Sequence, residues 1–226
     1  IRRSIFLAIV SLGAAPALVN AASCGINAII NRTIIAYAET GMADTAIAAA
    51  GIFVTYTSLP VTVALGICQG MQPIVGYNFG AGNGHRLWRA YWLAVGAASV
   101  ITTLPLLLTY TAPELVAMAF TDDTKLIHTT ALVLRTAMWA FAPVGFQVIS
   151  TAFFQSIGKA GKSVFVSLVR QVIFLVPLLI LLPRWMGFSG VWSAFPLSDV
   201  CATIVAAAMI AWQHRRLRMA ATPLPA

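Results

Sequence analysis

Long stretches without charged side chains divide this chain into six apolar segments. Each is about as long as, or longer than, the ~20 residues that an α-helix needs to cross the hydrocarbon core of a bilayer, and most charged residues fall between the segments. We predict six membrane-spanning helices, at residues 5–30, 46–74, 90–112, 130–154, 163–182 and 189–212.

The segments are predicted as helices because backbone polar groups in lipid must be satisfied within the protein, and because they exceed the ~10 residues of a membrane-barrel strand. The second segment is longer than a bilayer requires, and we expect it to bend at Pro60. The predicted fold is therefore an all-α membrane protein with one transmembrane unit at 1–218 and a cytoplasmic tail at 219–226.

The composition excludes an ordinary soluble domain. Of the 226 residues, 60% are hydrophobic and 9% are charged, whereas about 25% are charged in a typical soluble domain. The net charge of +8 does not indicate nucleic-acid binding, because the cations lie between apolar segments. We expect the lipid bilayer, and no nucleic acid, as a partner.

The distribution of Lys and Arg predicts the orientation in the membrane. Counted on alternate sides of the six segments, one side has Arg2, Arg3, Arg86, Arg89, Lys159, Lys162, Arg215, Arg216 and Arg218, and the other has Arg32, Lys125 and Arg184. The richer side faces the cytoplasm under the positive-inside rule. We therefore expect both ends to be cytoplasmic. As a separate expectation, we place this multi-pass protein in the plasma (inner) membrane of a bacterium.

Two predicted helices carry a row of polar residues at helical spacing. The rows are Asn20, Ser23, Asn27 and Asn31 in the first segment, and Pro143, Gln147, Thr151 and Gln155 in the fourth. Such side chains either join helices by hydrogen bonds or face a hydrated cavity. The candidate cavity residues, with aromatic neighbours added, are Asn20, Asn27, Tyr56, Gln69, Phe146, Gln147 and Gln155.

Asp199 is the only carboxylate within a predicted span. A buried carboxylate pairs with a cation or takes up a proton, and Arg135 and Arg170 are the available cations in neighbouring spans. We expect a structural ion pair rather than a role in ion coupling. Intact transport by an Asp199→Asn variant would agree with this expectation.

No pattern in the chain indicates an enzyme or a metal site. The sequence contains no HExxH, GxSxG, P-loop or GxGxxG motif. The three cysteines, Cys24, Cys68 and Cys201, lie in apolar segments without the spacing of a disulfide framework or of metal ligands. We predict no catalytic residue, no cofactor and no metal, although an intramembrane enzyme stays open as an alternative.

The beginning of the chain allows two interpretations. Arg2 and Arg3, followed by an apolar run and the small residues at 21–23, resemble a secretory signal peptide. The apolar run continues to Ile30, however, and five further segments follow, which favours a membrane span. Because the chain starts at Ile1, we expect it to be part of a longer protein.

Four stretches resemble the MATE (multidrug and toxic compound extrusion) transporters. GICQGMQPIVGYNFGAG at residues 66–82, followed by Arg86, is similar to the signature of an inner loop of that family. GFQ at 145–147 with FFQSIGK at 153–159 resembles the end of its tenth helix. Arg170-Gln171 with Pro177, and Gly190-Val191-Trp192 with Pro196 and Asp199, resemble its last two helices. The resemblance covers residues 4–218.

The resemblance implies a function and a partner. The chain would be the C-terminal six-helix lobe of a twelve-helix, pseudo-symmetric transporter, working with an N-terminal lobe that is missing here. It would export drugs or other cationic or amphipathic molecules in exchange for protons or sodium ions, by alternating access. Some subfamilies have an acid in the seventh and tenth helices, but segments 5–30 and 130–154 have none. The coupling acid is therefore expected in the other lobe.

Two alternatives remain open. A flippase for lipid-linked oligosaccharides of the same superfamily would need several cations for a pyrophosphate group, and only Arg135 and Arg170 are available. A non-transporting membrane scaffold would use the polar rows for assembly, so that mutating them would not alter any solute flux.

Overall fold

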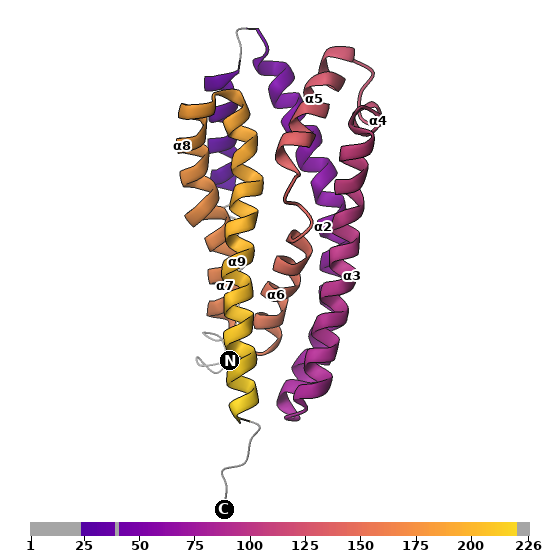
Figure 1. Cartoon of the computed structure of the whole chain (residues 1–226), viewed down its shortest axis with the longest axis vertical. Coiled ribbons are helices and arrows are strands. Elements are labelled where there is room, and N and C mark those ends of the chain that lie inside the picture. The colour runs from indigo at the N-terminus through magenta and orange to yellow at the C-terminus, as the bar shows by residue number, and fades with distance from the viewer. Residues whose placement is uncertain (1–23, 39–40, 221–226) are drawn as a thin grey trace, which may run out of the picture.

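Long helices run side by side along the whole length of the molecule (Figure 1). The structure is a computed structural model in which residues 24–38 and 41–220 are described. Asn20 and most of the first predicted span lie outside the described residues.

The described elements are all helical. They are a helix at residues 24–37, α2 (Ala43–Gly80), α3 (Gly84–Thr111), α4 (Pro113–Met118), α5 (Thr124–Ala137), α6 (Val144–Ser156), α7 (Ala160–Leu168), the π-helical segment η1 (Val169–Leu175), α8 (Val176–Met186) and α9 (Phe188–Ala220). No strand occurs in this part of the chain, so the prediction of an all-α protein is confirmed. The helix at 24–37 continues past the expected end at residue 30, because Ile34 is fully buried while Arg32 stays exposed.

Four of the described helices are long and apolar enough to cross a membrane. They are Ala43–Gly80, Gly84–Thr111, Ala160–Met186 and Phe188–Leu217. Each overlaps one predicted span and extends beyond it at one end or at both. The helix Ala43–Gly80 (α2) remains a single helix through Pro60 and Pro73.

The span predicted at 130–154 differs, because it is divided into α5 and α6 by non-helical residues 138–143. Pro143 lacks an N–H and disfavours helical geometry at the preceding residue, so the helix is interrupted there. Met138 and Phe141 are buried, and the Ala142 carbonyl accepts a hydrogen bond of 2.8 Å from the Thr102 hydroxyl of α3. Irregular backbone at membrane depth requires such shelter within the protein.

A second irregularity lies within the span predicted at 163–182. Residues 169–175 form the π-helical segment η1 between α7 and α8, and it carries Arg170. Pro177 has no N–H to donate to the carbonyl four residues earlier, which favours an altered hydrogen-bond pattern just before it. The apolar pattern continues without a break, so hydropathy alone predicts one regular helix.

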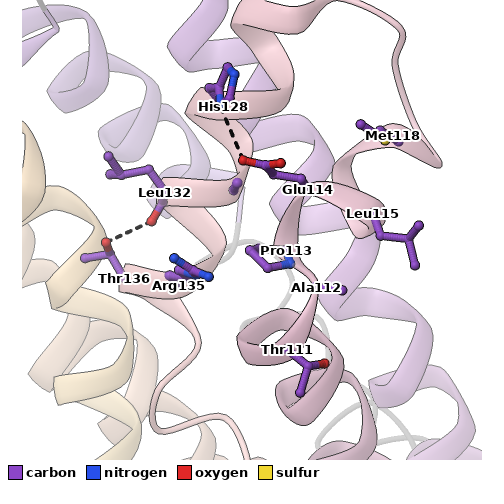
Figure 2. Close-up of a pocket in the computed structure, with 11 residues that line it drawn as sticks. Thr111, Ala112, Pro113, Glu114, Leu115, Met118, His128, Leu132, Arg135 and Thr136 are labelled. Atoms are coloured by element: carbon purple, nitrogen blue, oxygen red, sulfur yellow. Dashed lines mark hydrogen bonds and ion pairs between the residues drawn. The ribbon is translucent and has the colours of Figure 1, made fainter.

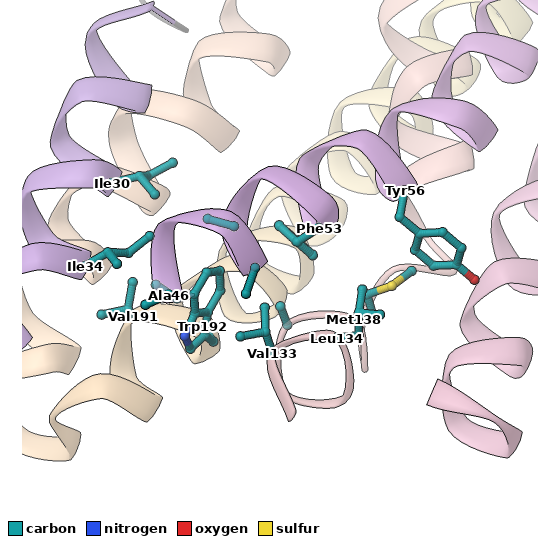
Figure 3. Packing of buried hydrophobic residues seen from close by; sticks show 14 of the residues in the cluster. Ile30, Ile34, Ala46, Phe53, Tyr56, Val133, Leu134, Met138, Val191 and Trp192 are labelled. Atoms are coloured by element: carbon teal, nitrogen blue, oxygen red, sulfur yellow. The ribbon is translucent and has the colours of Figure 1, made fainter. Parts of the chain in front are cut away.

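Two apolar cores are stacked along the bundle. The first joins residues 24–37, α2, α5, α8 and α9, and Figure 3 shows Ile30 and Ile34 beside Val191 and Trp192. The second joins the other half of α2 to α3, α6 and α9, with Tyr91, Phe153 and Phe154 fully buried. These cores fix the helices against one another and determine which faces remain exposed.

The helix ends lie at two opposite ends of the bundle (Figure 1), and the charged residues near them differ between the two ends. The end where α2 and α6 finish, called the basic end, carries Arg86, Arg89, Lys159, Lys162, Arg215 and Arg216. The opposite end, called the acidic end, carries Asp44, Glu114, Asp122 and Asp123. The topology thus collects on one end the described cations that the sequence places on one side of the membrane.

Candidate functional site

The exposed surface of α2 carries a row of polar side chains beside exposed apolar ones such as Leu59 and Val63. Thr55, Ser58, Thr62 and Gln69 form this row, while Phe53, Tyr56 and Cys68 face the core. Each hydroxyl donates to a carbonyl of its own helix, as Thr62 does to Ser58 at 2.9 Å. The hydroxyl oxygens therefore still have a lone pair with which to accept a hydrogen bond. We call these four residues the α2 polar face.

The helix at 24–37 adds two amides. Asn27 and Asn31 are exposed, whereas Ile26, Ile30 and Ile34 pack into the core. Asn27 and Asn31 are one helical turn apart, so their side chains lie on the same side of this helix. The described part of the predicted row is thus a surface feature of the chain, and Asn20 lies outside the described residues.

The exposed face of α3 has the opposite character. Leu93, Val100, Leu104 and Leu107 are between 56% and 67% exposed. These side chains are typical of a surface in contact with lipid, whereas an amide or hydroxyl in the same setting is costly unless it meets water or protein. α2 also has exposed apolar side chains, such as Leu59 and Val63. The two helices differ in that α2 adds a row of exposed polar residues, whereas the middle of α3 has none.

A buried polar junction connects α6, η1 and α9. The Gln147 amide donates to the Asp199 carbonyl at 2.9 Å and to the Thr203 hydroxyl at 2.8 Å. The Arg170 Nε lies 2.7 Å from the Asp199 carboxylate, which is almost fully buried. Arg170 is therefore the partner of Asp199, and Gln147 binds the same helical turn.

The other predicted residues are spread over different surroundings. Tyr56 is buried and its hydroxyl donates to the Pro105 carbonyl of α3 at 2.9 Å. Gln69 and Gln155 are exposed. Phe146 lines a groove of about 390 Å³ between α3 and α9, together with Trp88 and Trp92. The candidate residues thus do not form one cavity within the described part of the chain.

Arg135 lies in a groove of about 820 Å³ at the acidic end, between α4 and α5 (Figure 2). His128 Nδ1 is 3.5 Å from the Glu114 carboxylate across this groove, and both side chains are more than half exposed. Arg135 is exposed and lies in α5, whereas Asp199 is buried in α9. Of the two cations considered from the sequence, it is the one that does not pair with Asp199.

The sequence analysis missed Thr55, Ser58 and Thr62 of the α2 polar face. Their spacing of three and four residues is the signal by which they could have been found. It was obscured because single hydroxyl residues are common in apolar helices. It also missed Gln213, which is fully buried and accepts hydrogen bonds from Lys159 and Lys162.

Comparisons with known proteins are consistent with this architecture. The family model MatE matches residues 16–181. The multidrug export protein MepA of Staphylococcus aureus (strain MSSA476) is 25% identical over 158 residues, which cover 70% of this chain and 35% of MepA. The chain therefore matches only about a third of the length of this relative.

Solved structures with the same fold include an outward-facing and an inward-facing structure, each described as a multidrug resistance MATE family transporter. The outward-facing structure matches with a TM-score of 0.84 and 22% identity, covering 96% of this chain and 48% of that one. The inward-facing structure matches with a TM-score of 0.84 and 21% identity, covering 97% and 50%.

The all-helical fold of the described residues and their long apolar helices define this chain as a helical membrane protein unit. Because the family model covers well over half of its residues, the chain belongs to the MatE family.

Proposed function

We propose that this chain is one lobe of a secondary antiporter that exports drugs or organic cations, and that the α2 polar face lines the substrate pathway. The observation that carries the proposal is the row of exposed polar side chains on α2, which has no counterpart in the middle of α3. A polar surface at membrane depth is retained where it meets water or a second protein surface. Asn27, Gln69 and Gln155, all exposed, are the predicted cavity residues that remain available to a substrate.

The second lobe is part of the proposal. Transporters of this type place the substrate between two repeats that rock against each other. The chain matches about half of each solved transporter chain, which supports a pathway completed by a further six-helix unit. The basic end is proposed to face the cytoplasm of a bacterial cell, since positive residues are retained on that side.

A lobe that keeps its shape is part of the proposal. An outward-facing and an inward-facing structure each match this chain with a TM-score of 0.84, which agrees with this part of the proposal. The two apolar cores explain why the lobe can move as one body. Alternating access would then change the contacts of the α2 polar face and leave those of the cores in place.

The coupling ion is proposed to be a proton or sodium bound mainly outside this lobe. Among the described residues, Asp199 is the only buried carboxylate, and it is paired with Arg170. The other described acids are exposed at the acidic end. An acid of the second lobe is therefore the expected site of coupling.

Efflux of ethidium, an organic cation, from cells that express this lobe together with the second lobe tests the pathway. Thr62→Val and Gln69→Leu remove polar groups from the α2 polar face, and we expect each to lower the efflux rate several-fold at an unchanged membrane level. Thr111→Val is the matched control, because this exposed threonine of α3 donates to its own helix at 2.9 Å as Thr62 does. Efflux should be equal to wild type in this control.

Equal efflux by Thr62→Val, Gln69→Leu and the control would contradict the proposed pathway and would favour the scaffold alternative. Collapsing the proton gradient and the sodium gradient separately identifies the coupling ion. The flippase alternative is disfavoured, because Arg170 is engaged by Asp199 and the α2 polar face carries no cation.

A further inference from the structure

An apolar groove runs between α2 and α3 and ends at two arginines. Its volume is about 560 Å³. Its walls are formed by Ile67, Met71 and Ile74 of α2 and by Ala90, Leu93 and Ala97 of α3. The small alanines of α3 leave space along the helix, and the groove opens beside the lipid-facing surface of α3. Its shape and lining suit a hydrocarbon chain.

Arg86 and Arg89 lie at the basic end of this groove. They are three residues apart in the first turns of α3, so they lie on neighbouring parts of the helix surface, and both are exposed. The first turn of α3 contains no acid, and Asn83 does not cap it with its side chain. The positive end of the helix dipole therefore adds to the two guanidinium charges.

Nothing in the described part of the chain neutralises these arginines. The ion pairs found there are His128 with Glu114 and Arg170 with Asp199, neither of which is at the basic end. The nearby cations make neutral contacts instead. Lys159 and Lys162 donate to the Gln213 carbonyl oxygen at 2.9 and 3.1 Å, and the Lys162 ammonium lies 3.8 Å from the centre of the Trp212 ring. The basic end thus has an excess of positive charge beside an apolar groove.

We propose that this groove binds an anionic phospholipid, with its phosphate at Arg86 and Arg89 and one acyl chain between α2 and α3. Guanidinium groups bind phosphate oxygens through paired, charge-assisted hydrogen bonds, and basic pockets at the ends of membrane helices recognise such headgroups. An organic cation would be repelled by the two arginines. A free phosphate would leave the apolar groove unused, whereas a phospholipid satisfies both parts.

Native mass spectrometry of the purified protein tests the proposal. Phosphatidylglycerol or phosphatidylcholine is added to the protein in detergent. The protein is then released from the detergent in the mass spectrometer, and the number of lipid molecules that stay bound to it is counted. The double variant Arg86→Gln/Arg89→Gln is expected to lose at least half of the phosphatidylglycerol that wild type retains. The control Lys125→Gln/Arg184→Gln removes the same charge from exposed residues outside the basic end and should retain the wild-type number.

A second variant tests the acyl chain separately. Ala97→Leu fills the groove and should lower phosphatidylglycerol retention several-fold without changing the charge. Ala208→Leu is its control, because Ala208 is an exposed alanine of α9 that does not line the groove. Equal loss of phosphatidylglycerol from both double variants would overturn the proposal. Unchanged retention in Ala97→Leu would also overturn it, because the acyl chain would then not lie in the groove.

Discussion

At the scale of single residues, the ion pair between Arg170 and Asp199 is asymmetric. The Asp199 side chain is 6% exposed, whereas the Arg170 side chain is 35% exposed. Loss of the arginine would leave a carboxylate buried without a partner. Loss of the carboxylate charge would leave a long cationic side chain that can extend towards water.

We therefore predict that Arg170→Met destabilises the protein more than Asp199→Asn. Leaving a buried charge unpaired costs about 3–5 kcal/mol, whereas replacing both partners by apolar residues is often close to neutral. The measurement is the unfolding midpoint in detergent. The double variant Arg170→Met/Asp199→Leu should recover most of the loss seen in Arg170→Met alone.

The same residues test the structural role of the pair. Ethidium efflux by Asp199→Asn should stay within about twofold of wild type, as an exposed-acid control such as Asp44→Asn should. Loss of ion-coupled efflux in Asp199→Asn at an unchanged unfolding midpoint would instead assign Asp199 to coupling.

The sequence predicted that Asp199 pairs with a cation but could not choose between Arg135 and Arg170. The choice depends on the interruption at 138–143, which separates α5 from α6 and leaves Arg135 in the groove beside α4. Helical spacing cannot predict which way a side chain points on the far side of such a break. The path of the backbone therefore determines which arginine pairs with Asp199.

At the scale of helices, the close approach of α6 to α3 depends on Gly145. A Cβ atom at this position would lie 2.7 Å from the backbone carbonyl carbon and oxygen of Ala98, and 2.9 Å from the Thr102 hydroxyl. These distances are shorter than van der Waals contact, and the opposing backbone atoms cannot rotate away. The contact also holds the interrupted segment, because Thr102 donates to the Ala142 carbonyl.

We predict that Gly145→Ala lowers the free energy of unfolding by about 1–3 kcal/mol, as overpacking of a tight contact does. The control is Gly96→Ala, since a Cβ at Gly96 of α3 meets no atom within 4 Å. Alanine is the better helix former, so this control should be neutral or slightly stabilising. Similar unfolding midpoints for the two variants would show that α6 can move away from α3 at no cost.

Where hydropathy changes, helix ends lie close to charged residues: α3 begins at Gly84, just before Arg86, and α6 ends at Ser156, just before Lys159. Both helices extend beyond the predicted spans, by six residues at the start of α3 and by two at the end of α6. The break at 138–143 and the π-helical segment at 169–175 have apolar sequences on both sides, and their prolines suggest an irregularity without giving its geometry. Local hydrogen bonding and tertiary packing decide these details.

At the scale of the whole molecule, the chain has two kinds of exposed surface that a periodicity analysis cannot distinguish. Asn27, Gln69 and Gln155 were predicted as polar positions of membrane helices. Whether such residues join helices or remain on a surface depends on which neighbours cover them. The structure leaves them exposed, while it buries Tyr56 and Gln147 in contacts with other helices.

The final prediction concerns access of water to these two surfaces. We expect a cysteine at Thr62 to react in membranes with a water-soluble maleimide, and a cysteine at Val100 to react at least tenfold more slowly. Both positions are exposed and lie near the middle of α2 and α3, so depth in the bilayer does not explain the difference. The natural cysteines Cys24, Cys68 and Cys201 must first be replaced by alanine. Equal rates would show that the α2 polar face is covered by lipid or protein, and would remove the physical basis for a hydrated pathway along it. Faster labelling at Thr62 that is slowed by ethidium would connect this surface directly to the transported molecule.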